Sequence, residues 1–107
     1  MFDFDEVFSE MIDLINSSID DIKEEIEQLQ YEGVQSYVLK ELSKDSPNLV
    51  NQYNNQIEKT KIELEKLFQQ KHDQQIILDK LIAIREGSIE FDYENLEKEW
   101  INNLSFD

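Results

Sequence analysis

Apolar residues recur at helical spacing through the first third of the chain. Between Phe4 and Leu29 they are separated alternately by four and three residues, which is the spacing of a helix that packs along other helices. The positions are Phe8, Ile12, Ile15, Ile19, Ile22, Ile26 and Leu29. This pattern predicts a helix over about residues 4–30 with these side chains in the core, and Gly33 is a residue typical of a helix end.

A second, longer helix is predicted from Pro47 to Glu86, before Gly87. Ser46 is a suitable N-cap, and proline is favoured at the first position of a helix. Its apolar positions alternate in the same way and form a second seam. The residues expected in the core are Leu64, Leu67, Leu78 and Leu81.

Seven polar residues, 69–75, interrupt this second seam. Lys71 and Gln74 fall on the seam itself. A buried polar residue there can fix the register or the oligomeric state of paired helices. Alternatively, the seam is open to water at this point, and the sequence leaves both interpretations open.

Two shorter helices are also predicted. Residues 34–42 repeat the spacing of three and four and predict a short connecting helix. Asp92 is a suitable N-cap for a C-terminal helix. Because the second long helix outruns the first, this C-terminal helix is expected to pack back over residues 76–86, with Trp100 as its buried anchor. Residues 88–93 alternate polar and apolar positions, so a short strand is the alternative there.

Composition agrees with a fold made of helices. Two glycines and one proline allow few turns, whereas a β-sandwich or barrel needs many. Apolar residues make up 39% of the chain, which suits an elongated helical bundle. The 107 residues are expected to form a single helical domain, 1–107. The predicted fold is all-α: an elongated antiparallel helical hairpin that the two shorter helices extend into a three- to four-helix bundle.

The net charge of −15 is concentrated at the two ends of the chain. Residues 1–34 hold eleven acidic residues and one lysine, and residues 87–107 hold six acidic residues and one lysine. Residues 35–86 hold eight of each sign. Binding to phosphates requires Lys and Arg, so direct contact with nucleic acid or with an anionic membrane is not expected. A partner with a basic surface is expected instead.

The outer face of the first helix carries a regular row of carboxylates. Its members are spaced by four and three residues, and Ser17 occupies the one gap. The row consists of Glu6, Glu10, Asp13, Asp20, Glu24 and Glu27. Neighbouring carboxylates on such a face lie about 5–6 Å apart and repel one another. A rigid row of this kind can imitate a nucleic-acid backbone in a basic groove; the alternative is a solvated face that keeps the protein in solution.

Residue types that carry chemistry are sparse. There is no cysteine, which excludes disulfides and Cys-ligated zinc, and the single histidine, His72, lacks convergent partners. No calcium-loop pattern, Gly-rich phosphate loop or nucleophile motif is present. We therefore expect no enzyme activity, no metal and no cofactor. The first residues lack a basic and apolar signal sequence, and no apolar run is long enough to span a membrane, so a soluble cytoplasmic protein is expected.

Tyr93 and Glu97 form a Tyr-x-x-x-Glu pair near the C-terminus. This pair resembles the Tyr-x-x-x-Asp/Glu tail motif of small helical-hairpin substrates and partners of type VII secretion. The resemblance covers two residues, and the Trp-x-Gly turn of the best-known branch of that family is absent. It would imply a helical-hairpin fold and a helical partner.

Two functions follow from these features. The first is a non-enzymatic acidic protein that occupies a basic, nucleic-acid-binding surface of a protein partner, as small phage or bacterial inhibitors, nucleic-acid mimics and immunity-type proteins do. The second is a coiled-coil assembly or adaptor subunit, including a type VII secretion-like hairpin partner. Ile, Phe and Leu on the seam favour more than two strands, so the second function includes a homodimer of hairpins.

Overall fold

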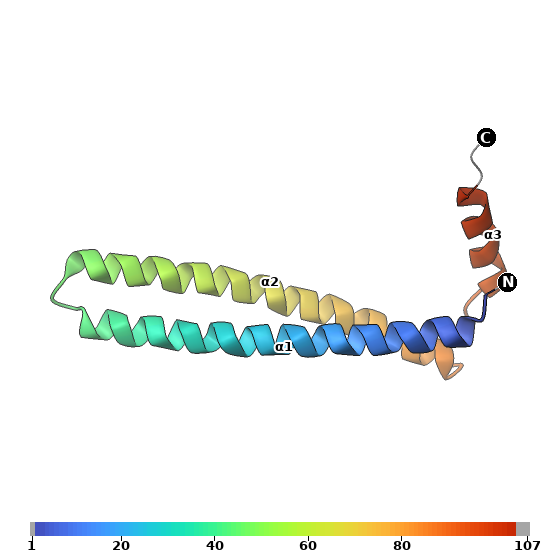
Figure 1. The fold of residues 1–107 in the computed structure, drawn as a ribbon, viewed down its shortest axis with the longest axis horizontal. Coiled ribbons are helices and arrows are strands. Elements are labelled where there is room, and N and C mark those ends of the chain that lie inside the picture. The colour runs from blue at the N-terminus through green and yellow to red at the C-terminus, as the bar shows by residue number, and fades with distance from the viewer. Residues whose placement is uncertain (1, 105–107) are drawn as a thin grey trace.

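The computed structural model describes residues 2–104, which form three α-helices and no strand. α1 spans Phe4–Leu42, α2 spans Pro47–Arg85 and α3 spans Tyr93–Asn103. α1 and α2 lie side by side in opposite directions and are joined by the turn at residues 43–46 (Figure 1). The molecule is elongated, with extents of 68 × 37 × 18 Å. The prediction of an all-α fold is confirmed.

α1 continues through Gly33 without a break, so the predicted end near residue 30 and the separate helix at 34–42 are both wrong. A glycine that ends a helix adopts a positive φ, and among the described residues only Gly87 does so. Gly33 instead faces α2, where a Cβ added to it would lie 3.6 Å from Cγ2 of Thr60. Packing against α2 therefore maintains the helix at a residue with poor helix propensity.

The seam of α1 continues beyond Leu29 with the same spacing. The less exposed positions of its second part are Gly33, Ser36, Lys40 and, at the C-cap, Ser43. Small and polar side chains occupy this second part of the seam, whereas isoleucines occupy most of the first part. Because the period is unchanged, one face of a single helix lies along α2 over its whole length.

α2 begins and ends close to the predicted bounds. Ser46 is its N-cap and Pro47 its first residue, although the Ser46 side chain makes no capping hydrogen bond. At the other end Gly87 adopts a φ of 82°. The N–H of Ser88 donates to the carbonyl of Ala83 at 2.8 Å, and that of Gly87 donates to Ile84 at 3.1 Å. These two bonds form a Schellman motif, in which glycine avoids the strain of a left-handed conformation.

The two long helices have equal lengths of 39 residues, so the expected overhang of residues 76–86 does not occur. The contact between Gly33 and Thr60 sets the register. In an antiparallel pair, each step forward along one helix is matched by an equal step backward along the other. Counted in this way, Lys71 lies level with Ile22, and the polar interruption of α2 faces the isoleucines of α1.

The apolar core lies in the part of the pair that contains the N-terminus. Its buried cluster consists of Phe8, Ile12, Ile19, Leu78 and Leu81. Ile22 and Ile26 are buried further along α1. Of the other predicted core residues, Ile15, Leu29, Leu64 and Leu67 are half-buried. The strongest packing therefore lies near the start of α1 and the end of α2.

Aromatic rings connect the start of α3 to the start of α1. The Tyr93 ring lies 4.8 Å from that of Phe4 and 5.8 Å from that of Phe8, measured between centroids. Phe91 lies 5.7 Å from Phe8, with its ring edge-on. In addition, the N–H of Phe2 donates to Oε1 of Glu97 at 3.0 Å. These contacts hold the first turn of α3 and the irregular segment before it, where no strand forms at residues 88–93.

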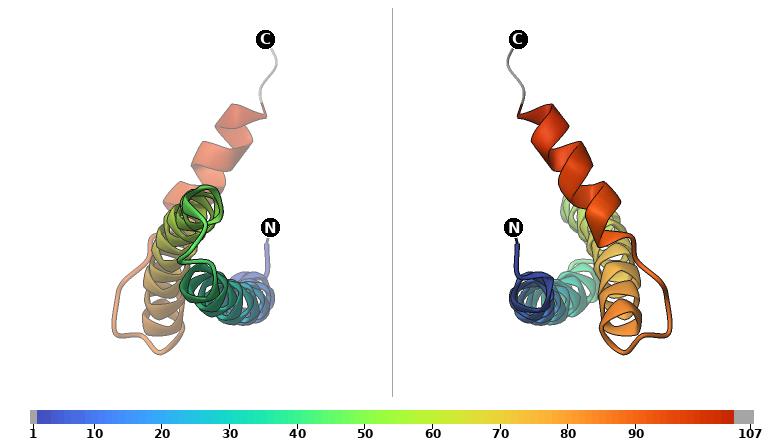
Figure 2. Two further views of the ribbon diagram at one scale, coloured as in Figure 1. Left: turned by 90° about the vertical axis from the view of Figure 1, so that its left-hand side faces the viewer. Right: turned by 90° about the vertical axis from the view of Figure 1, so that its right-hand side faces the viewer.

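The rest of α3 does not pack back over the end of α2, so the expected bundle of three or four helices is not formed. Figures 1 and 2 show α3 extending away from the two long helices. Trp100 is 49% exposed, and its prediction as a buried anchor is wrong. The physical reason is the equal length of α1 and α2, which leaves no overhanging apolar face for α3 to cover.

Candidate functional site

The six predicted carboxylates occupy the face of α1 that points away from α2. Each lies two residues before a seam position, which is a rotation of about 200° on a helix. All six residues are exposed: Glu6, Glu10, Asp13, Asp20, Glu24 and Glu27. From first to last they span about 32 Å at the rise of an α-helix. We call this row the acidic stripe.

Cations are scarce around the acidic stripe. Within residues 2–104 the structure contains a single ion pair, in which Nζ of Lys44 lies 2.7 Å from Oε2 of Glu41. That pair is at the opposite end of α1, beside the turn. The hydrogen bond from Lys44, aided by its charge, lowers the pKa of the Glu41 carboxyl below its usual value. Charge compensation is thus found near the turn, while the stripe presents its carboxylates to solvent.

The face that carries the acidic stripe becomes apolar near the turn. Continuing the alternation of four and three residues after Glu27 leads to Tyr31, Val34 and Val38, and Leu42 follows one helical turn later. Their exposed fractions are 63%, 62%, 52% and 79% in that order. Sequence analysis missed this continuation because it ended the first helix before Gly33. In the continuous helix, the stripe and these apolar residues lie on one line.

The exposed apolar residues border a groove between α1 and α2. On this side of the pair, a hollow of about 450 Å³ is lined mainly by Gly33, Val34 and Tyr37 of α1 and by Ile57 and Leu64 of α2. A second hollow of about 400 Å³ adjoins it. Its lining residues are Val34, Tyr37, Val38, Glu41 and Leu42. We call the two together the apolar groove. Gly33 deepens it because no side chain fills the space beside Val34.

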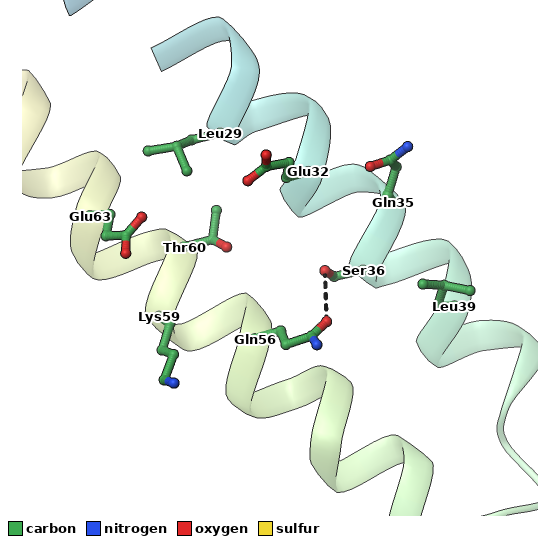
Figure 3. A pocket seen from close by; sticks show the side chains of 9 residues that line it. All are labelled: Leu29, Glu32, Gln35, Ser36, Leu39, Gln56, Lys59, Thr60 and Glu63. Carbon is green, nitrogen blue, oxygen red and sulfur yellow. Dashed lines mark hydrogen bonds between the residues drawn. The ribbon is translucent and has the colours of Figure 1, made fainter. Parts of the chain in front are cut away.

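A polar groove lies on the other side of the same seam (Figure 3). It has a volume of about 410 Å³. In Figure 3 the side chains of Ser36 and Gln56 point toward each other across it, and Ser36 Oγ donates to Gln56 Oε1 at 3.5 Å. Glu32, Lys59 and Glu63 line its rim. This is a long, weak hydrogen bond between helices, and it joins two residues that serve the pairing of α1 and α2.

Other chemistry-bearing residues are dispersed over the molecule. Among residues 2–104, no three His, Cys, Asp or Glu side chains gather as metal ligands would. His72 is exposed on α2. No helix in this range combines the length and the apolar character that crossing a membrane requires. Tyr93 and Glu97, the residues of the tail-motif resemblance, contact the start of the chain through an aromatic ring and a carboxylate.

A shallow apolar depression lies between the start of α1 and α3. It has a volume of about 320 Å³ and is lined by Phe2, Phe4, Val7, Leu96, Glu97 and Trp100. Trp100 thus contributes to an open surface.

Comparison of the chain with protein-family models, curated proteins and solved structures finds no significant match.

Proposed function

We propose that this chain is a non-enzymatic interaction protein that binds a basic surface of a protein partner through the acidic stripe. In this proposal it acts as a small phage or bacterial inhibitor or as an immunity-type protein, and it competes for a surface that binds nucleic acid. The observation that carries the proposal is the row itself: six exposed carboxylates on one face of one helix, directed away from α2.

Both the rigidity of α1 and the charge of the stripe favour this kind of binding. Like charges at i,i+4 destabilise a helix by a few tenths of a kcal/mol for each pair. The stripe contains two such pairs, Glu6 with Glu10 and Asp20 with Glu24, and two further pairs that are three residues apart. A partner that places Lys or Arg opposite the stripe would remove this repulsion. Long-range attraction would also speed association and make it sensitive to salt. The proposal treats α1 and α2 as one antiparallel hairpin that keeps the stripe straight.

Charge reversal on the stripe tests the proposal. The full chain is immobilised and exposed to lysate of its source cells, and captured proteins are eluted with increasing salt. We expect a basic protein that elutes at raised salt and is no longer captured by the double variant Asp13→Lys, Asp20→Lys. The control Glu58→Lys, Glu65→Lys makes the same change in net charge on α2, at two exposed positions, and should still capture it. Equal capture by both variants, or binding that persists at high salt, contradicts the proposal.

A second candidate function is an assembly or adaptor subunit, in the manner of a helical-hairpin partner in a larger complex. The exposed apolar residues beside the turn favour it, because contiguous apolar surface commonly marks a protein interface. Light scattering over a range of concentrations tests the form in which two hairpins associate. That form predicts a mass that rises to a dimer with concentration, and a monomer at every concentration contradicts it.

A further inference from the structure

We propose that the apolar groove is the anchor site for an amphipathic helix of the partner protein, and that the same partner helix continues over the acidic stripe as a row of Lys or Arg. The inference rests on the proposed function and deepens it by naming the chemistry of the partner. One end of the partner helix would be apolar on its contact face, and the other end would be basic on that face.

Collinearity of the two surfaces is the first argument. Glu27 and Tyr31 are successive positions on one face of α1, and the helix is unbroken between them. The apolar part from Tyr31 to Leu42 covers about 17 Å along the axis, and the stripe covers about 32 Å. Val34 lies where this face meets the groove, so a partner helix that seats apolar side chains beside Val34 and crosses α1 at a small angle passes from the groove onto the carboxylates.

The shape of the groove favours a helix as the occupant. One hollow of the groove lies between the two antiparallel helices, and the other lies on α1 alone. The border residues Val34, Val38 and Leu42 recur once per turn. Side chains at i, i+3, i+4 and i+7 of an amphipathic helix match this repeat and insert between such ridges. The apolar face of Ile57 and Leu64 on α2 forms the second wall. A third helix would thus contact both long helices.

Charge determines the direction in which the occupant lies. Around the groove, Glu41 is paired with Lys44, and Lys61 adds a positive charge to the lining. Lys40 lies 5.7 Å from the centroid of the Tyr37 ring. A basic segment would meet like charge here and opposite charge along the stripe. The cations of the partner therefore belong over residues 6–27, and its apolar residues belong near the turn.

A second copy of this chain matches the surface less well. Its exposed apolar residues lie mainly beside the turn, on α3 and on α2, where they include Ile62, Phe68, Ile76 and Ile77. Residues 35–86 hold as many acidic as basic residues, and residues 87–107 contain one lysine and six acidic residues, so none of these segments offers an excess of cations to the stripe. A copy carrying a charge of −15 would bring carboxylates toward the stripe. The complementary occupant is a basic partner, and self-association becomes an outcome of the test.

Three synthetic helical peptides test the inference with the full chain. In the first, one face carries leucines in one half and lysines in the other half. The second has the same composition, but leucine and lysine alternate along that face. The third keeps the lysines of the first and replaces each leucine with glutamine. Fluorescence anisotropy of each labelled peptide, titrated with the protein at physiological salt, gives the affinities, and amide chemical shifts locate the binding.

We expect the first peptide to bind about tenfold or more tightly than the other two, because only it can bury several leucines while its lysines meet the stripe. Amide shifts should change at residues 31–42 and along the stripe. The variant Val34→Glu should remove the advantage of the first peptide. Leu14→Glu adds the same charge at a position that is 70% exposed on the acidic part of α1, and it should preserve that advantage.

Failures of the two proposals are distinguishable. If the first two peptides bind equally and the third also binds in a salt-sensitive way, the stripe functions and the anchor inference is wrong. If the lysine-only peptide does not bind at all, the proposed function fails and the inference fails with it. If light scattering without peptide detects a dimer whose amide shifts change at residues 31–42, the groove belongs to a second copy and the inference is overturned.

Discussion

The two ends of the helical pair differ in what their seam contains. The open part consists of residues 4–26 of α1 and residues 67–85 of α2. The closed part consists of residues 27–42 and 47–66, and the turn joins its two helices. Every buried apolar side chain among the described residues lies in the open part. The buried residue of the closed part is Ser36, which lies one turn from Gly33. The same four–three spacing therefore supports an apolar core in one part. In the other part, small and polar residues of α1 face the half-buried Val50, Tyr53, Ile57 and Leu64 of α2.

This difference determines where the packing energy of the helical pair lies. Burying an Ile, Leu or Phe side chain contributes about 1.5–3 kcal/mol, so the open part supplies most of the packing energy of the pair. In the closed part, several apolar side chains of α1 lie outside the seam and are exposed to solvent: Tyr31, Val34, Tyr37, Val38 and Leu42. We infer that the open part holds the fold together and carries most of the acidic stripe on its outer face, and that the closed part presents apolar surface.

The largest expected effect on stability comes from truncating a core side chain in the open part. Phe8 is 5% exposed and contacts Phe4, Phe91 and Tyr93 through its ring. Phe8→Ala should lower the free energy of unfolding by about 3–5 kcal/mol, because it removes a buried ring from three aromatic neighbours. Urea denaturation followed by circular dichroism measures the loss. Tyr37→Ala in the closed part is the matched change, and its cost should stay below about 1 kcal/mol. Similar losses for both variants would contradict the division of the pair into two parts.

A smaller effect is expected at the polar interruption of α2. Lys71 is half-buried on the seam and lies level with Ile22, one of the buried isoleucines. Lys71→Leu should raise the free energy of unfolding by about 1 kcal/mol, because it extends apolar contact in the open part. Thermal or urea unfolding measures the change. Lys66→Leu, at an exposed position of the same helix, serves as the control and should leave stability nearly unchanged. A loss of stability in Lys71→Leu would show that the lysine has a specific role in the register.

The smallest effects are expected at the two glycines, and they should have opposite signs. Gly33→Ala should stabilise the protein by about 0.5–1 kcal/mol, because its φ is helical and the new Cβ would make an ordinary contact with Thr60. Gly87→Ala should destabilise it by about 1 kcal/mol, since alanine is strained at a φ of 82°. Chemical denaturation of both variants measures the two changes in the free energy of unfolding. Destabilisation by Gly33→Ala would indicate that α1 breaks at this residue.

Much of α1 and α2 could be predicted from local sequence signals. The positions from Phe8 to Leu29 identify the inner face of α1, and Ser46 with Pro47 marks the start of α2, since both signals depend on residues near in sequence. The local sequence around Gly33 could not show whether the helix ends there, because a glycine suits both a helix end and a close contact between helices. The choice depends on Thr60, which is distant in the sequence.

The candidate site could also be predicted in part: its carboxylates could, and its apolar residues could not. The carboxylates of the stripe follow from spacing alone once the first helix is recognised. The apolar residues that continue the stripe required knowledge that α1 passes Gly33. The position of Trp100 depended on the relative lengths of α1 and α2, and an error in the first length became an error in the placement of α3.

The unbroken helix through Gly33 also sets the angle between the acidic stripe and the apolar residues that follow it on α1. Each residue in an α-helix turns the chain by about 100°, so the number of residues between Glu27 and Tyr31 determines whether carboxylates and apolar side chains face the same way. One residue more or fewer would direct them to different sides. Seven more would restore the direction to within about 20° and lengthen the rod by about 10 Å. The relative direction of the two surfaces thus depends on the number of residues between them. Only changes of length close to a whole number of helical turns, such as seven or eleven residues, preserve it.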